Sequence, residues 1–199
     1  RSSEKKLKSK INTILLHDVS DLKSKKKNKI YTSLNKLKKM KIVKNIGFSA
    51  YNLEEVKSIL KEFNFDVVQV PFNVFDQRLI DKKFLKVLKK NKTKIYIRSI
   101  FLQGLLIDYK KKNKITKRYF NNFNKWHKFL KSKKLKPIEA CIIFVKKYRF
   151  YSKILIGFDD FNQLNEILLY FNRSKNYNID FKSLKSNDLS LINPINWKQ

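Results

Sequence analysis

The chain has 199 residues, a formal net charge of +31 and 42% apolar side chains. This length suits one sizeable domain, and no apolar run reaches the roughly 18 residues that a membrane-spanning helix needs. There is no signal-peptide pattern and only one cysteine, Cys141, so the composition excludes a disulfide-rich scaffold and favours a reducing, cytoplasmic setting. Cys141 lies in the apolar stretch EACIIFV, which predicts a buried packing role.

Lysine supplies most of the positive charge, because only six of the 47 basic residues are arginine. Proteins that bind nucleic acid usually use arginine as well, since its guanidinium can form two hydrogen bonds at once with a phosphate or a guanine. The lysines are spread along the whole chain, and the densest runs fall between apolar segments. We interpret them as solvated surface and expect no specific nucleic-acid partner. A basic nucleic-acid-binding protein is the alternative, and weak polyanion binding at low salt follows in either case.

Five short apolar segments predict β-strands. Each is about four to six residues long and apolar at consecutive positions, which is typical of a parallel strand buried on both faces. In chain order they are residues 13–17, 44–49, 66–70, 94–99 and 153–158.

Amphipathic segments between the strands predict α-helices. The clearest has Asn52 as its N-cap, acidic residues in its first turn and apolar residues at helical spacing. Another has Pro137 in its first turn, where proline is tolerated. The helices are expected at residues 33–40, 52–63, 79–91, 119–134, 137–148 and 162–172. Strand followed by helix, repeated without a flexible linker, predicts an α/β fold with a parallel sheet in a single domain over residues 1–199.

Glycine occurs only at positions 47, 104 and 157. Neither a G-x-G-x-x-G turn nor a G-x-x-x-x-G-K loop exists, so any nucleotide must be held in another way. No cluster of histidine, cysteine or acidic residues has the spacing of metal ligands, so no metal site is predicted.

Polar or small residues mark the carboxyl end of every predicted strand, which is where the chemistry of a (β/α) barrel gathers. An amide inside a buried strand, as at Gln69, is tolerated when it finds partners in a lined pocket, and it suits recognition of another amide. The strand-end residues are His17 and Asp18, Ser49, Gln69 and Asn73, Arg98 and Ser99, and Gly157 with Asp159 and Asp160.

Five segments in order resemble the aldo/keto reductase family, from about residue 5 to about residue 172. The family's fourth strand with its histidine resembles INTILLHDVSDL. Its L-K-x-x-G-K-x-x-x-I-G-V-S passage resembles LKKMKIVKNIGFSAYN, with Met40 where a glycine is usual. Its sixth strand is similar to DVVQVPFNVFDQR and its seventh to IYIRSIFLQGLL. Its last helix–strand–helix is similar to PIEACIIFVKKYRFYSKILIGFDDFNQLNEIL.

The resemblance implies a (β/α)8 TIM barrel that is incomplete here, with about five of eight β/α units and the N-terminal strands absent. The chain, which opens on Arg1, is then expected to be the C-terminal two-thirds of a longer protein. The implied function is NAD(P)H-dependent reduction of a small carbonyl substrate to an alcohol by hydride transfer, with the oligomeric state open.

The resemblance also assigns site residues. His17 matches the histidine that hydrogen-bonds the substrate carbonyl, and Ser49 and Gln69 match the groups that hold the nicotinamide carboxamide. Ala50 replaces an asparagine that serves there in many members. Arg98 stands where many members stack a tyrosine on the nicotinamide. The implied cofactor-binding residues beyond these are Ser99, whose turn through Gln103 passes near the pyrophosphate, and Gly157, Gln163 and Glu166 at the adenosine end.

Two further expectations concern the coenzyme and activity. Asp159 and Asp160 stand where NADPH-preferring members place basic groups, so NADP and NAD both remain possible; the pair also suits a helix cap. The family's catalytic tyrosine, lysine and aspartate have no match in this sequence. We therefore expect little or no turnover from this chain alone, and a degenerate barrel kept for binding is a further alternative.

Overall fold

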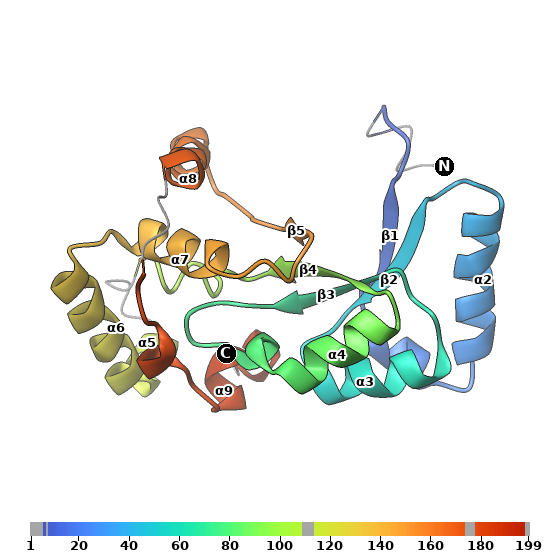
Figure 1. Cartoon of the computed structure of the whole chain (residues 1–199), viewed down its shortest axis with the longest axis horizontal. Coiled ribbons are helices and arrows are strands. Elements are labelled where there is room, and N and C mark those ends of the chain that lie inside the picture. Colours follow the sequence, from blue (N-terminus) through green and yellow to red (C-terminus); the bar gives the residue numbers. More distant parts are fainter. Residues whose placement is uncertain (1–5, 7, 109–113, 174–177, 198–199) are drawn as a thin grey trace. The chain divides into compact units, whose positions relative to one another are not determined.

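All five predicted strands are present in the computed structural model, which describes residues 6, 8–108, 114–173 and 178–197. They form one sheet in the order β1-β2-β3-β4-β5, and the β1–β2 and β2–β3 pairs are parallel (Figure 1). The α/β architecture predicted from the sequence is confirmed. The fifth strand is shorter than predicted and ends at Ile154. The strands are β1 (Thr13–Leu16), β2 (Asn45–Ser49), β3 (Val67–Pro71), β4 (Lys94–Arg98) and β5 (Lys153–Ile154).

The helices occupy the predicted segments but differ at their ends. Helix α2 begins at Lys27 rather than Ser33, because lysine is a good helix former and the run before Ser33 continues the helix. No helix in the described ranges is long and apolar enough to cross a membrane. The longer helices are α2 (Lys27–Lys39), α3 (Leu53–Glu62), α4 (Lys82–Lys90), α6 (Phe120–Lys133), α7 (Pro137–Lys146) and α8 (Phe161–Arg173). The short ones are α5 (Lys114–Arg118), α9 (Leu189–Ile192) and 3-10 turns at Val19–Leu22, Arg78–Ile80, Lys182–Leu184 and Pro194–Asn196.

Helices α3 and α7 have the N-terminal residues and hydrogen bonds that the sequence predicted. The Asn52 side chain accepts a hydrogen bond from the Glu54 N–H at 2.9 Å, which satisfies a donor that the first turn of α3 leaves free. Pro137 is the first residue of α7, and the Glu139 carboxylate accepts from the Lys136 N–H at 3.4 Å. Both N-terminal signals in the sequence are therefore confirmed.

The chain divides into two compact units. The first unit comprises residues 1–70, 80–96 and 151–153, and it contains β1, β2 and helices α2 to α4. The second unit comprises residues 71–79, 97–150 and 154–199, and it contains helices α5 to α9. The boundaries pass through β3, β4 and β5.

The sheet of the first unit is strongly curved. The Thr13 hydroxyl and the Tyr96 hydroxyl lie 3.4 Å apart, although β2 and β3 separate their strands. Neighbouring strands are about 4.8 Å apart, so β1 and β4 would be about 14 Å apart in a flat sheet. The sheet must curl toward the face that carries these two side chains, as an arc of a barrel does.

The core of the first unit contains a cluster of rings and a strand segment that is buried throughout. Tyr31 of α2 packs against Phe63 and Phe65, and Phe65 in turn packs edge-on against Phe48 of β2, with ring centroids 5.0 Å apart. Alternate residues of a strand point to opposite faces, so the burial of every residue from Ile46 to Ser49 means that both faces of β2 are covered. This agrees with the consecutive apolar pattern in the sequence.

The second unit is organised around α7. Every residue of this helix from Ala140 to Val145 is buried, so it is covered on all sides. Cys141 is one of these residues, and burial raises the pKa of its thiol far above the ordinary value, which confirms the predicted packing role. Phe144 contacts Phe72 and Phe181 from different segments of the unit.

Three lysines close helices in the left-handed conformation that favours glycine. Lys41, Lys92 and Lys134 follow α2, α4 and α6 with φ of 56°, 54° and 53°. Met40, which the family resemblance set at the position of a usual glycine, has a φ of −73° and needs no glycine. The backbone conformation that favours glycine belongs to Lys41, one residue later.

Candidate functional site

Three of the sequence-predicted residues lie at, near or directly after the carboxyl ends of adjacent strands in the first unit. The register pairs Leu16 with Phe48 and Ser49 with Gln69. Continuing the first pairing by one residue sets His17 opposite Ser49. Parallel pairing thus sets Ser49 opposite Gln69 near the ends of β2 and β3, and His17 follows directly after β1 at the same edge of the sheet.

Ser49 and Gln69 are joined directly. The Ser49 hydroxyl donates to Gln69 Oε1 at 3.0 Å, and the Ala50 N–H donates to the Gln69 backbone carbonyl at 2.9 Å. Ser49 is 8% exposed and Gln69 is half-buried. The Gln69 Nε2 group has no hydrogen-bond partner among the described residues, and the Ser49 oxygen keeps acceptor capacity. The pair thus presents a donor and an acceptor side by side, which is what binding a carboxamide requires.

His17 and Asp18 follow β1 directly and are both exposed. The Asp18 carboxylate accepts a hydrogen bond from the Ser20 N–H at 2.8 Å and caps the turn at Val19–Leu22. Hydrogen bonds from the backbone and then the side chain of Ser20 lower the pKa of Asp18, and the neighbouring His17 adds a smaller effect in the same direction. Asp18 therefore has a structural role in the loop that carries His17.

Arg98 and Ser99 open a strained turn in the second unit. An Arg98 guanidinium nitrogen donates to the Ser99 hydroxyl at 3.2 Å. Ser99, Leu102 and Gln103 all have positive φ, at 57°, 48° and 54°, before Gly104 at 82°. Each non-glycine residue in this region costs on the order of 1 kcal/mol, and such strain persists only where the surroundings hold it.

The polar residues that follow β3 hold this turn and their own loop. Asn73 is fully buried; its Nδ2 donates to the Ser99 carbonyl at 3.1 Å, and its Oδ1 accepts from the Phe75 and Asp76 N–H groups at 3.0 and 2.9 Å. The buried Asp76 carboxylate accepts two hydrogen bonds from the Arg78 guanidinium, at 2.8 and 2.7 Å. The Asn73 side chain, which follows a predicted strand end, thus supports the backbone of its own loop and of the turn at Ser99.

The residues predicted for the adenosine end lie before and within α8, also in the second unit. Asp160 caps the helix by accepting from the Gln163 N–H at 2.8 Å, and the Gln163 side chain accepts from the Asp159 N–H at 2.7 Å. The capping interpretation is thus confirmed for Asp160, whereas Asp159 contributes its backbone N–H. Gly157 is exposed, and a Cβ at its position would meet no atom within 4 Å; Glu166 is half-buried.

The described ranges contain no group of three or more histidine, cysteine or acidic side chains that could hold a metal ion.

Solved structures of similar fold are aldo-keto reductases. The holo form of an aldo-keto reductase from Bacillus halodurans superposes with a TM-score of 0.67 at 12% identity, covering 87% of this chain and 59% of that chain. A putative 2,5-diketo-D-gluconic acid reductase B gives 0.63 at 14% identity, covering 97% and 63%. A glycerol dehydrogenase from Gluconobacter oxydans gives 0.53 at 14% identity, covering 89% and 64%. The chain therefore spans less than two thirds of the length of these barrels.

Comparison with curated protein sequences gives no significant match. The sequence model of the Aldo/keto reductase family, in contrast, matches residues 1–186, nearly the whole chain. This match agrees with the fold and with the ordered segments in the sequence. The chain belongs to the Aldo/keto reductase family.

Proposed function

We propose that this chain supplies the nicotinamide-binding part of an NAD(P)H-dependent aldo/keto reductase that reduces a small carbonyl substrate to an alcohol. The observation that carries the proposal is the Ser49–Gln69 pair at the carboxyl ends of β2 and β3. The chain would then be one barrel domain that corresponds to the C-terminal two-thirds of the reductase.

The chemistry of the pair fits a nicotinamide. The Gln69 Nε2 group is a donor for the carboxamide oxygen, and the Ser49 oxygen is an acceptor for the carboxamide NH₂. The hydrogen bond between the two side chains holds both in place before a ligand arrives, which reduces the conformational entropy lost on binding. When bound, the coenzyme would supply a hydride.

By family membership, the remaining sequence-predicted residues are proposed to hold the rest of the coenzyme. The strained turn from Ser99 to Gln103 is proposed to offer backbone N–H groups to the pyrophosphate, and Arg98 its planar guanidinium to the nicotinamide ring. Gln163 and Glu166 are proposed for the adenosine end. Asp159 and Asp160 oppose a 2′-phosphate electrostatically, so NADH is expected to compete well with NADPH.

His17 is proposed to hydrogen-bond the substrate carbonyl, because it follows β1 at the sheet edge where Ser49 ends β2 and is open to solvent. No residue of the chain matches the family's catalytic tyrosine, lysine and aspartate, so no proton donor for the carbonyl is assigned. We therefore propose that the chain alone binds the coenzyme with little or no turnover.

A fluorescence titration of the 199-residue chain with NADPH and with NADH tests the proposal. A saturable change with either coenzyme, abolished by excess NADP or NAD, is expected. Titration with inorganic pyrophosphate serves as a control for attraction to the basic surface, which is salt-dependent and does not need a nicotinamide. If neither coenzyme gives a saturable signal, or if pyrophosphate competes as well as the whole coenzyme, nicotinamide recognition is refuted.

A further inference from the structure

The α5–α6 segment, residues 114–136, carries a local surplus of positive charge. It contains nine basic residues and no acidic residue. Residues 154–172 of the same unit, in contrast, contain three acidic residues and no basic residue, so the positive charge is not spread evenly through this lysine-rich chain. The basic residues of the α5–α6 segment are Lys114, Lys117, Arg118, Lys125, Lys128, Lys131, Lys133, Lys134 and Lys136.

The charge of the α5–α6 segment is not balanced by ion pairs. Within the part of the chain that the structure describes, no carboxylate pairs with any of these nine side chains. The first unit differs, because Lys27 pairs with Glu62 and Lys38 pairs with Asp66. Like charges three or four residues apart on a helix repel each other and destabilise it. The α5–α6 segment therefore retains a repulsion that an anionic partner would relieve.

An aromatic ring lies on the same side of α6 as two of its lysines. Phe123, Trp126 and Leu130 are buried and hold the helix on its unit, and Trp126 Nε1 donates to the Leu106 carbonyl at 3.0 Å. Positions 120, 124, 128 and 131 recur at helical spacing on another side, where Phe120 is 64% exposed. They form a stripe about 16 Å long. The residues of this α6 stripe are Phe120, Asn124, Lys128 and Lys131.

The position of the segment in the fold agrees with a free outer surface. The segment follows β4, which is an inner strand of the sheet, whereas β1 and β5 are the strands at its ends. Its exposed lysines and its exposed ring therefore do not lie beside the unpaired edge of β1.

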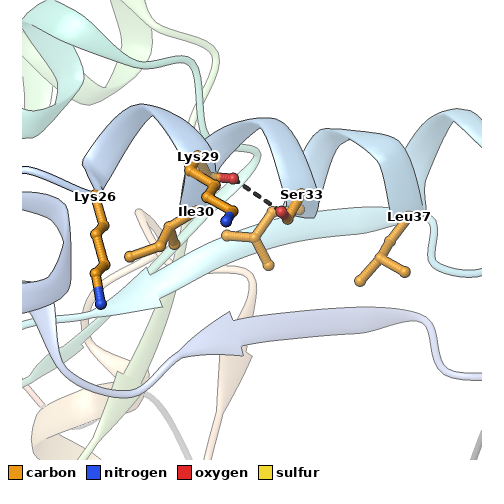
Figure 2. Close-up of a pocket in the computed structure, with 6 residues that line it drawn as sticks. Lys26, Lys29, Ile30, Ser33 and Leu37 are labelled. Carbon is orange, nitrogen blue, oxygen red and sulfur yellow. Dashed lines mark hydrogen bonds between the residues drawn. The ribbon is translucent and has the colours of Figure 1, made fainter.

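Two other lysine-rich helices present different surfaces. On α4 the lysines are exposed, but the aromatic residue Phe84 is only 1% exposed. On α2 the side chains between the lysines are aliphatic, and Figure 2 shows Ile30 and Leu37 with Lys26 and Lys29 around a groove of about 510 Å³. The α6 stripe instead combines exposed lysines with an exposed aromatic ring.

From these observations we propose that the α5–α6 segment binds single-stranded nucleic acid without sequence preference. Its lysines would neutralise backbone phosphates, and the Phe120 ring would stack on an unpaired base. Lysine is a point charge that lacks the paired hydrogen bonds of arginine to guanine, so this surface suits phosphates rather than a base sequence. A membrane fits less well, because the apolar side of α6 is buried in its own unit. The inference does not depend on coenzyme binding.

Fluorescence anisotropy tests the proposal. A labelled oligouridylate of about 16 nucleotides is titrated with the 199-residue chain in about 0.15 M NaCl, where the Debye length of about 8 Å screens distant charges. We expect saturable binding that weakens as the salt concentration rises. A duplex of the same length and vesicles of anionic lipid are the competitors. The proposal is overturned if binding does not saturate, or if either competitor, which offers no unpaired base, binds as tightly as the single strand.

Charge-matched variants separate this segment from the charge of the whole chain. K128Q/K131Q removes two lysines three positions apart from α6, and K83Q/K86Q removes two exposed lysines at the same spacing from α4. We expect the α6 variant to bind the oligouridylate roughly tenfold more weakly, with a slope of log K against log salt that is smaller by about 1.4, at about 0.7 for each phosphate contact. The α4 variant should bind like the wild type. Equal losses in the two variants would mean that only net charge matters, and the proposal would then fail.

The variant F120A tests base stacking. It should weaken binding by about tenfold and leave the salt slope unchanged, because it removes an aromatic contact and no charge. F161A is the matched control, since Phe161 is also exposed but lies among the acidic residues of 154–172, and this variant should bind like the wild type. All four variants alter exposed side chains and should keep the wild-type circular dichroism spectrum and urea midpoint. Wild-type affinity in F120A, or an equal loss in F161A, contradicts the proposal.

Discussion

The Ser49 hydroxyl donates to Gln69 Oε1 across 3.0 Å, and these residues come from different strands, 20 positions apart in the sequence. Parallel pairing of β2 with β3 sets them opposite each other. A shift of the register by one residue would turn one side chain to the other face of the sheet and separate them. The hydrogen bond between Ser49 and Gln69 therefore depends on the strand register, and a shift of the register would destroy the candidate site.

Removing either member of this pair should weaken coenzyme binding. We expect Q69L and S49A each to reduce the affinity for NADPH or NADH by about tenfold, corresponding to the roughly 1.4 kcal/mol of one hydrogen bond to the carboxamide. Fluorescence titration measures this. S132A makes the same chemical change as S49A at an exposed position of α6, where the hydroxyl donates to the Phe129 carbonyl, and this variant should bind the coenzyme like the wild type. Equal losses of coenzyme affinity in S49A and S132A would show that Ser49 of β2 does not bind the coenzyme.

Replacing Gly47 with alanine should strongly destabilise the fold. An ideal Cβ at this position would lie 2.3 Å from the Val67 carbonyl oxygen and 2.7 Å from Leu15 Cδ2. The backbone oxygen belongs to the neighbouring strand and cannot turn aside, so we expect G47A to lower the free energy of unfolding by about 3 kcal/mol, measured by urea denaturation. G157A is the matched control, since nothing lies within 4 Å of its Cβ position, and it should be nearly neutral.

Glycine at Lys41 should stabilise the protein. Lys41 has a φ of 56°, which a residue with a Cβ adopts at a cost and glycine adopts readily. After allowing for the greater freedom of glycine in the unfolded chain, we expect K41G to raise the free energy of unfolding by about 0.5–1 kcal/mol. K36G, within α2, should lower it by about 1 kcal/mol. Urea midpoints that move in the same direction for both variants would contradict this explanation.

Truncating Asn73 should release the turn at Ser99. The buried Asn73 side chain satisfies the Ser99 carbonyl and the N–H groups of Phe75 and Asp76. Leaving these groups without their partner should cost about 3 kcal/mol in N73A, at roughly 1 kcal/mol for each hydrogen bond. N162A alters an exposed asparagine and should leave the urea midpoint unchanged. A urea midpoint for N73A within error of the wild-type value would show that the turn at Ser99 does not depend on the Asn73 side chain.

The contribution of Asp18 to stability should disappear in acid. Hydrogen bonding to Ser20 lowers the pKa of Asp18 below 3.8, its ordinary value. The stabilisation is therefore fully present above the unfolded-state pKa and is lost as the pH falls through the folded-state pKa. We expect the difference in urea midpoint between wild type and D18A to be visible at neutral pH and to vanish below the folded-state value. A difference that is constant across this range would show that the carboxylate charge plays no part.

Local patterns in the sequence identified the five strands, the longer helices and the starts of two of these helices. Consecutive apolar residues located all five strands, and Asn52 and Pro137 marked where α3 and α7 begin, because these signals depend on neighbours within one turn or one strand. The start of α2 was missed, since a run of lysines looks the same in a loop as on an exposed helix. The short helices at Lys114–Arg118 and Leu189–Ile192 were missed as well, because they have too few residues for a periodic pattern.

What the sequence by itself determined is the order of strands and helices and the family to which they belong. The tertiary structure alone decided that Ser49 bonds Gln69, that Asn73 serves the Ser99 turn, and that Lys41 rather than Met40 takes the left-handed conformation. It also decided that the sheet curls far enough for Thr13 to approach Tyr96. The physical reason is that periodicity arises from bonded neighbours, whereas register and curvature arise from packing between segments far apart in the chain.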